Sequence, residues 1–226
     1  MDKQVLDFGY VRLIESWGSD ERIVEAARMS TSGGFRGWDT DSKLLRYLWE
    51  HKHLSPFEMA GLTIEVQAPI FVFREWHRHR TQSYNELSAR YTELPDIFYI
   101  PSIERLMAGG QSKVNKQGSG EGLSRENANE AIIWIGEASR QARCKYDLLL
   151  SRGVSRELAR LVIPVNQYSR MRASANLRNW LAFLSLRQGE GAQWEIRQYA
   201  EAVAQIVADL YPRTYSLFRQ EQDGSK

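Results

Sequence analysis

The sequence contains little cysteine and no long hydrophobic run. A single cysteine, Cys144, occurs in 226 residues, so no intramolecular disulfide can form and nothing indicates an oxidising compartment. The longest strictly apolar runs, such as residues 131–135, are far shorter than the ~20 residues that span a bilayer. The polar first residues are not followed by the apolar core of a signal peptide. These absences predict a soluble cytoplasmic protein that is not held in a membrane.

Lysine is scarce, and neither sign of charge is in clear excess. Thirty basic residues oppose 28 acidic residues, which leaves a formal charge of +2, and 23 of the basic residues are arginine. A protein that binds duplex DNA usually has a larger basic excess, so a nucleic-acid polymer is a disfavoured ligand. Many arginines fall in residues 74–90 and 156–187. Because the guanidinium group suits bidentate contact with phosphate and carboxylate, these two windows predict small anionic ligands.

The hydrophobic pattern predicts one α+β domain over residues 1–226, with a small mixed or antiparallel sheet and several long helices. Alternation of apolar and polar residues predicts strands over residues 8–16 and 62–67. Helical periodicity and end signals predict helices over residues 20–27, 41–51, 69–79, 124–153, 156–162, 176–186 and 193–210. Residues 81–92 are expected to be irregular. The glycine-rich residues 108–122 predict a mobile loop, and residues 220–226 a short polar tail.

All four histidines, His51, His53, His77 and His79, lie within 29 residues. The histidines form two His-x-His pairs. In a strand, the two rings of such a pair would lie on one face, whereas in a helix residues two apart point in different directions. No cluster of cysteine or aspartate accompanies them, so no metal site is expected. A metal-dependent hydrolase, which a chelator would inactivate, stays open as an alternative. His51 and His77 are expected to be surface residues at helix ends.

Residues 55–58, Ser-Pro-Phe-Glu, have the pattern of a helix capping box. Serine stands at the cap, proline at the first helical position and glutamate three residues after the cap. The free N–H groups of a helix start also attract anions. Helix capping and phosphate or cofactor binding are therefore compatible at this segment.

Residues 73–91, FREWHRHRTQSYNELSARY, form the densest polar stretch of the chain. Arginines, aromatic residues and small polar residues alternate there, which suits a phosphorylated planar ligand. A solvated helix end with scattered ion pairs, or an RNA-binding surface whose affinity falls with salt, is an open alternative. No phosphate-binding glycine loop in the usual form occurs, so side chains must hold any nucleotide. In the second window, Arg160 and Arg187 either face a ligand or pair with a carboxylate.

Two possible nucleophiles lack a partner base. Cys144 lies within a predicted helix, with no histidine nearby in the sequence. Ser88 has no nearby base except His79, and a serine nucleophile needs one. We therefore expect neither residue to attack a substrate, and we expect Ser88 to bind one.

Arg78-His79-Arg80, followed by seven residues and then Ser88, resembles the signature of flavin-dependent thymidylate synthases. Residues 51–58, 156–164 and 176–187 resemble further segments of that family in the same order, and the resemblance covers most of the chain. It implies an enzyme that methylates dUMP at carbon 5 to give dTMP. It further implies 5,10-methylenetetrahydrofolate as carbon donor, reduced FAD as hydride donor, NADPH as reductant, and a homotetramer with sites where subunits meet.

The resemblance also implies which residues form the site. Cofactor contacts are expected from His53, Ser55, Glu58, Arg78, His79, Arg80, Glu86, Asn176, Leu177 and Arg178. Substrate contacts are expected from Glu75, Trp76, His77, Arg78, Glu86, Leu87, Ser88, Ala89, Arg90, Arg160 and Arg187, and Arg187 is expected to be catalytic by polarising the uracil. Two positions depart from the family pattern: Glu75 replaces a glutamine of many members, and Ala182 stands where a polar side chain that contacts the flavin is expected.

Overall fold

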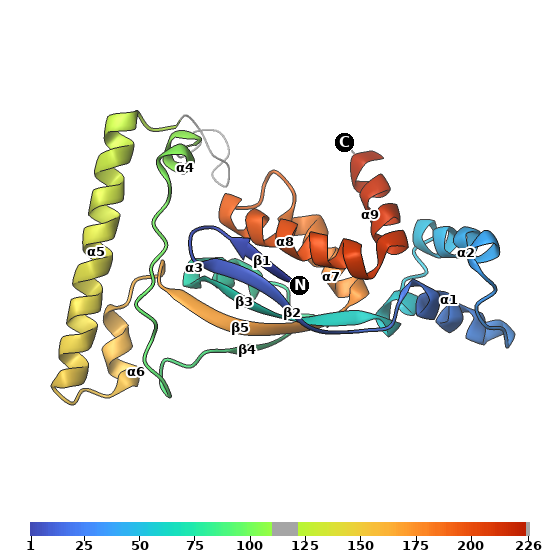
Figure 1. Cartoon of the computed structure of the whole chain (residues 1–226), viewed down its shortest axis with the longest axis horizontal. Coiled ribbons are helices and arrows are strands. Elements are labelled where there is room, and N and C mark those ends of the chain that lie inside the picture. The colour runs from blue at the N-terminus through green and yellow to red at the C-terminus, as the bar shows by residue number, and fades with distance from the viewer. Residues whose placement is uncertain (110–121, 225–226) are drawn as a thin grey trace.

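The computed structural model describes residues 1–109 and 122–224, and its centre is a five-stranded antiparallel sheet (Figure 1). The strands lie in the order β1-β2-β3-β5-β4. Their bounds are Asp2–Val5 for β1, Gly9–Trp17 for β2, Gly61–Pro69 for β3, Ser83–Glu86 for β4 and Tyr168–Asn176 for β5. The predicted strands over residues 8–16 and 62–67 are confirmed as β2 and β3. The long β3–β5 pairing joins two segments that are about a hundred residues apart in the chain.

Helices cover one face of the sheet and extend beyond both of its ends. The α-helices are Asp20–Arg28 (α1), Trp38–Glu50 (α2), Ile70–Trp76 (α3), Ile103–Met107 (α4), Arg125–Ser151 (α5), Arg156–Ala159 (α6), Leu177–Arg187 (α7), Trp194–Leu210 (α8) and Pro212–Gly224 (α9). Short 3₁₀ helices are Met29–Thr31 (η1), Ser55–Met59 (η2) and Arg160–Val162 (η3). In Figure 1, α7 and α8 lie over the sheet, while α5 stands at one end and α1 and α2 at the other. All seven predicted helices are confirmed, with ends shifted by a few residues.

One prediction about an irregular segment is wrong, and part of the expected polar tail is helical. Residues 83–86 form strand β4, because they pair with β5 at the edge of the sheet, where a four-residue strand with polar side chains shows no clear alternation. Residues 220–224 belong to α9, whose Leu217 and Phe218 are buried. Residues 225–226 lie outside the described residues, as do residues 110–121 of the predicted loop over 108–122.

The predicted capping box is also wrong. Ser55 is the first residue of η2, Leu54 is its cap, and no side chain caps this helix. The carboxylate of Glu58 instead pairs with the guanidinium of Arg178 on α7. Burial of Pro56 and Phe57 outweighs the local capping pattern, and a 3₁₀ turn of five residues results.

A core of aromatic rings holds α3, α7 and α8 together. Trp76, Trp180, Phe183 and Tyr199 are fully buried. The Trp76 and Phe183 rings stack with centroids 4.6 Å apart, and the indole N–H of Trp180 donates to the carbonyl of Leu62 at 2.9 Å. Because each of the three helices contributes a large ring to this core, α3 and α7 are held in a defined position relative to each other.

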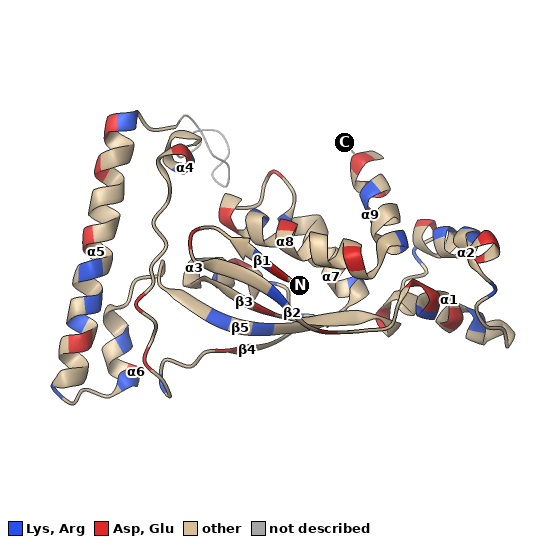
Figure 2. Ribbon diagram, viewed as in Figure 1, with Lys and Arg blue, Asp and Glu red and all other residues tan. Residues whose placement is uncertain are grey.

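Charge is distributed without a single dominant sign. Figure 2 shows basic and acidic residues interspersed along α5 and along α1 and α2. Within residues 1–109 and 122–224, no helix is both long enough and apolar enough to cross a membrane.

Candidate active site

Arg187, the last residue of α7, is the centre of a partly buried polar cluster that we name the Arg187 cluster. Its Nη1 donates to Glu75 Oε2 at 2.8 Å, its Nη2 to the Glu75 carbonyl at 2.8 Å, and its Nε to His79 Nε2 at 2.9 Å. The Arg187 side chain is only 14% exposed, whereas that of Glu75 is 43% exposed. Three of the five N–H donors of the guanidinium are thus used, and two are left for a ligand. The sequence left open whether Arg187 faces a ligand or pairs with a carboxylate. The structure shows the ion pair, with Glu75.

The electrostatics of this cluster keep His79 neutral. Burial, together with the nearby charge of Arg187, lowers the pKa of His79 from 6.5 to about 4, against the opposing effect of the Glu75 carboxylate. Because Nε2 accepts a hydrogen bond from Arg187, the ring proton of the neutral form lies on Nδ1. His79 is therefore an acceptor that orients Arg187, not a second cation.

We predict that the His79 ring does not titrate between pH 8 and about 5.5, and NMR of its Cε1–H resonance checks this. Since the folded pKa lies below the unfolded value, protonation favours the unfolded chain as pH falls from 6.5 towards about 4. A His79 midpoint near 6.5 would contradict the hydrogen-bonded arrangement.

A second group of expected residues lines one pocket of about 560 Å³, which we name the Arg160 pocket. Helix α3 forms one wall, the segment after β4 a second, and η3 a third. The lining includes five of the residues expected at the substrate, His77, Glu86, Leu87, Ala89 and Arg160, together with Arg74. Its polar groups and two arginines suit an anionic, hydrogen-bonding ligand.

The walls of the Arg160 pocket are held by β5. Ser169 Oγ donates to Glu86 Oε1 at 2.8 Å, and the N–H of Leu87 donates to the Arg170 carbonyl at 2.8 Å. Farther along, Ser88 Oγ accepts from the N–H of Arg90 at 3.3 Å. The Arg90 guanidinium lies 3.3 Å from Glu157 of α6, and both side chains are more than half exposed.

A further pocket of about 420 Å³ is lined by one of the residues expected at the cofactor, Arg178, and we name it the Arg178 pocket. It is lined by Leu54, Thr81, Arg178, Asn179 and Ala182, with further residues of α2, α7 and α9. Ala182, one of the two positions that depart from the family pattern, lines this pocket, and its methyl group offers no hydrogen bond. The Arg178 pocket thus combines apolar surface with the amide group of Asn179 and the guanidinium group of Arg178.

The other residues expected at the cofactor have different environments. His53 is exposed, with its ring edge-on to Tyr47 at 5.7 Å between centroids. Ser55, Arg78 and Arg80 are also exposed. These four side chains reach solvent in the single chain.

Two expected cofactor residues have structural roles at the start of α7. Asn176 caps this helix by accepting a hydrogen bond from the N–H of Asn179 at 3.0 Å. Leu177 is fully buried. A contact between Leu177 and a ligand would therefore involve its backbone.

Trp76 differs from the other residues expected at the substrate, because its ring is in the core. Its indole N–H donates to Gln82 Oε1 at 3.1 Å, and its carbonyl accepts from the Tyr84 hydroxyl at 3.2 Å. No face of the ring is exposed to a ligand in the chain.

Sequence reasoning missed Ser169, which holds Glu86, because it missed strand β5. The signal was present: Met171, Ala173 and Ala175 are buried, while Arg170 and Arg172 at alternate positions are exposed. The arginines were interpreted as ligand-binding residues, and the strand pattern that they form with the buried residues was not recognised.

Within the part of the chain that the structure describes, no group of three or more His, Cys, Asp or Glu is placed to hold a metal ion. His51 and His53 have ring centroids 6.4 Å apart, and His51 stacks on Tyr47 at 4.1 Å. Cys144 is exposed on α5.

Comparison with known proteins gives one consistent result. A family profile described as thymidylate synthase complementing protein matches residues 12–213. The flavin-dependent thymidylate synthase of Thermus thermophilus is 44% identical over 216 residues, which cover 96% of this chain and 77% of that protein. That of Thermotoga neapolitana is 42% identical over 214 residues, which cover 95% of this chain and 92% of that protein.

A solved structure agrees with these sequence matches. The crystal structure of the UMP/dUMP methylase PolB from Streptomyces cacaoi, bound with 5-Br dUMP, superposes with a TM-score of 0.87 at 35% identity. The match covers 96% of this chain and 97% of that one. With the profile, the relatives and the fold in agreement, the chain belongs to the family of flavin-dependent thymidylate synthases.

Proposed function

We propose that this chain methylates carbon 5 of dUMP to form dTMP, with 5,10-methylenetetrahydrofolate as carbon donor and NADPH as reductant. The observation that carries the proposal is the Arg187 cluster. Glu75 and His79 hold the guanidinium in place and leave two of its N–H donors for a ligand. Such a preorganised cation stabilises negative charge that develops on a uracil carbonyl when the ring becomes nucleophilic.

FAD is the cofactor of this family, and when bound it supplies the hydride. The Arg178 pocket fits such a group, because the apolar surface of Leu54 and Ala182 suits a ring system and Arg178 and Asn179 offer N–H donors. Four other expected cofactor residues, His53, Ser55, Arg78 and Arg80, have exposed side chains.

The chain's own residues have separate tasks in this proposal. The two arginines of the Arg160 pocket, Arg74 and Arg160, bind the phosphate of the nucleotide. The Arg187 guanidinium orients the base and withdraws electron density from it. Glu75 fixes Arg187 and also offsets part of its charge, which explains how a carboxylate is tolerated at a position where glutamine is common.

We further propose that the site is completed between subunits of a homotetramer. Within one chain, α3 presents Glu75 to the Arg187 cluster and Arg74 to the Arg160 pocket, so the two groups of residues face different spaces. Large apolar side chains are exposed beside the Arg160 pocket and on α5, including Leu161 at 76% and Trp134 at 64%. Exposed apolar surface of this kind is typical of subunit interfaces. Light scattering of the eluting protein measures the mass of the assembly.

The function is tested with the purified full chain and FAD. We expect a yellow protein that releases tritium from [5-³H]dUMP only when NADPH and methylenetetrahydrofolate are both present. UMP is assayed in parallel, because the Streptomyces cacaoi neighbour is described as a UMP/dUMP methylase. A colourless protein that cannot be reconstituted with FAD would refute the proposal.

A further inference from the structure

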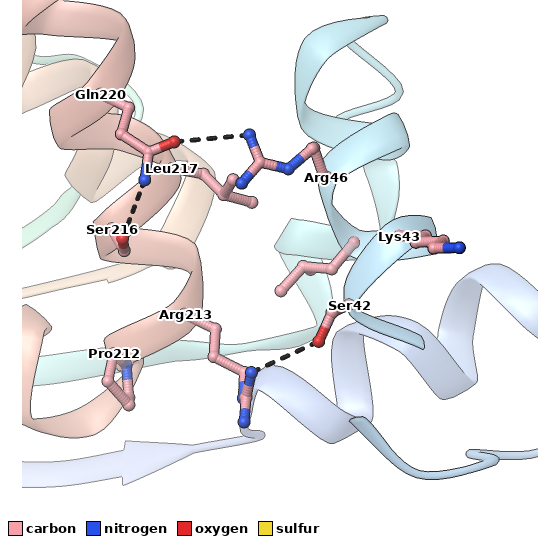
Figure 3. A pocket seen from close by; sticks show the side chains of 9 residues that line it. Ser42, Lys43, Arg46, Pro212, Arg213, Ser216, Leu217 and Gln220 are labelled. Atoms are coloured by element: carbon pink, nitrogen blue, oxygen red, sulfur yellow. Dashed lines mark hydrogen bonds between the residues drawn. The ribbon is translucent and has the colours of Figure 1, made fainter. Parts of the chain in front are cut away.

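A cavity of about 440 Å³ lies between α2 and α9, away from the three groups of expected site residues (Figure 3). Its lining combines an apolar part, from Leu45, Pro212 and Leu217, with hydroxyl, amide and guanidinium donors. Lys43, Arg46 and Arg213 supply three positive charges, and none of the described residues that line the cavity is acidic. The cavity is therefore suited to a ligand with both methylene and anionic groups.

The two arginines lie at opposite ends of this cavity. In Figure 3, Arg46 reaches from α2 towards Gln220, Arg213 reaches from α9 towards Ser42, and Leu217 lies between them. Arg46 Nη1 is 3.4 Å from Gln220 Oε1, and Arg213 Nη1 is 3.4 Å from Ser42 Oγ. Arg46 Nη1 also lies 3.5 Å from Glu50 Oε1, in an ion pair whose side chains are both more than half exposed. Such an exposed pair is weak, and the long hydrogen bonds to Gln220 and Ser42 leave further N–H donors of both arginines for an anion.

Arg213 is also held in place by an aromatic ring. Its guanidinium lies 4.1 Å from the centroid of Trp38. Its backbone N–H donates to the buried carboxylate of Asp20 at 2.8 Å, which anchors the start of α9 on α1. A cation that is already ordered loses less conformational entropy when it binds a ligand.

The cavity continues towards the expected cofactor site. A smaller pocket of about 340 Å³ shares Arg46 with it and reaches Lys52. Lys52 also lines the Arg178 pocket. We name the two pockets that extend from Lys52 to Arg213, next to the Arg178 pocket, the α2–α9 groove, and the cations Lys52, Arg46 and Arg213 follow it in that order. Two carboxylates also line its smaller pocket, Glu221, which pairs with Lys52, and Glu50, which pairs with Arg46.

We propose that the α2–α9 groove binds the γ-linked glutamate tail of the folate co-substrate. Folates carry one or more glutamates, whose carboxylates are separated by methylene groups, and the groove presents separated cations with apolar surface between them. A single phosphate needs donors that converge on one point, whereas Arg46 and Arg213 lie at opposite ends of the cavity. This inference rests on the proposed function, because it requires the pteridine end to react at the flavin beside the Arg178 pocket.

The test compares methylenetetrahydrofolate carrying one glutamate with the same compound carrying five. For the unaltered enzyme we expect the KM of the pentaglutamate to be about tenfold lower, since two or three partly exposed ion pairs are gained. Arg46→Gln and Arg213→Gln should each raise that KM about threefold, and the double variant should remove the preference. The KM of the monoglutamate and the rate of NADPH oxidation should not change.

Matched variants distinguish a loss of binding in the groove from a general effect of the protein's charge. Arg22→Gln removes the same charge from an exposed site on α1, where the side chain is 69% exposed, and should keep the preference. Arg213→Lys keeps the charge and should retain part of the preference for the pentaglutamate. Calorimetric titration with penta-γ-glutamate that lacks the pteridine measures binding without turnover, and thermal melting confirms that each variant is folded.

The outcomes are distinct. Equal KM values for the two folates with the unaltered enzyme, or an unchanged preference in the double variant, would overturn the proposal. A rise in the KM of NADPH instead would assign the groove to the phosphates of NADPH and would also overturn it. If no folate supports dTMP formation, the proposed function fails, and calorimetry alone then decides whether the groove binds the tail.

Discussion

Replacement of Arg187 by alanine is expected to lower the rate of dTMP formation about 100-fold and to leave the protein folded. The guanidinium is preorganised by Glu75 and His79, and removal of one preorganised donor at a developing charge costs ~3 kcal/mol of barrier. Little stability is lost, because Glu75 is 43% exposed and its carboxylate stays solvated after the change. Tritium release from [5-³H]dUMP gives the rate, and thermal melting gives the stability.

Two variants sharpen this prediction. Arg187→Lys keeps a positive charge but cannot donate to Glu75 and His79 in the same geometry, so it should recover only part of the rate. Arg219→Ala removes an exposed arginine of α9 that pairs with Asp223 at 3.5 Å, and should be fully active. Normal turnover of the Arg187→Ala enzyme would show that Arg187 has no catalytic role.

Replacement of Trp76 by alanine is expected to destabilise the protein by about 4 kcal/mol and to lower its melting temperature by about 10 °C. The ring is fully buried, stacks on Phe183 and donates a hydrogen bond to Gln82. Its removal leaves a cavity between α3 and α7 and a buried amide oxygen without its donor. Denaturant unfolding, followed by far-UV circular dichroism, measures the change.

The matched variants for this position test burial as the cause. Trp76→Phe keeps most of the stacked ring and should lose much less stability. Phe8→Ala removes a ring that is 55% exposed and should cost little. Normal stability of Trp76→Ala, combined with a specific loss of dUMP affinity, would contradict the structural role and favour a substrate contact.

Glu75 and Trp76 are neighbours in the chain, and the resemblance assigned both to the substrate. On α3, successive side chains point about 100° apart, so one reaches Arg187 and the other enters the core. The sequence could not separate them, because both lie in the same dense polar segment. Their different burial follows from where α7 and α8 pack.

Most of the helices could be predicted because their signals are local. Ser19 and Ser124 accept the capping hydrogen bonds of α1 and α5, and the apolar stripe of α8 is buried, as its helical periodicity predicts. Strands β4 and β5 were missed because an edge strand and an arginine-rich strand show weak or concealed alternation. The whole of α9 was missed because its sequence is mostly polar, and Leu217 and Phe218 hold the helix against the core. The short elements β1 and α4 were missed as well.

The sequence by itself determined the α+β class, the two arginine-rich windows and, through its motifs, the family. Only the tertiary structure decided that Arg187 meets Glu75 and His79 across more than a hundred residues, and that Arg160 lies with Glu86 in a different pocket. It also decided that Arg46 and Arg213, which carry no motif, share one groove. Periodicity and capping act over a few residues, whereas these contacts depend on how the aromatic core and the β3–β5 pairing bring distant segments together.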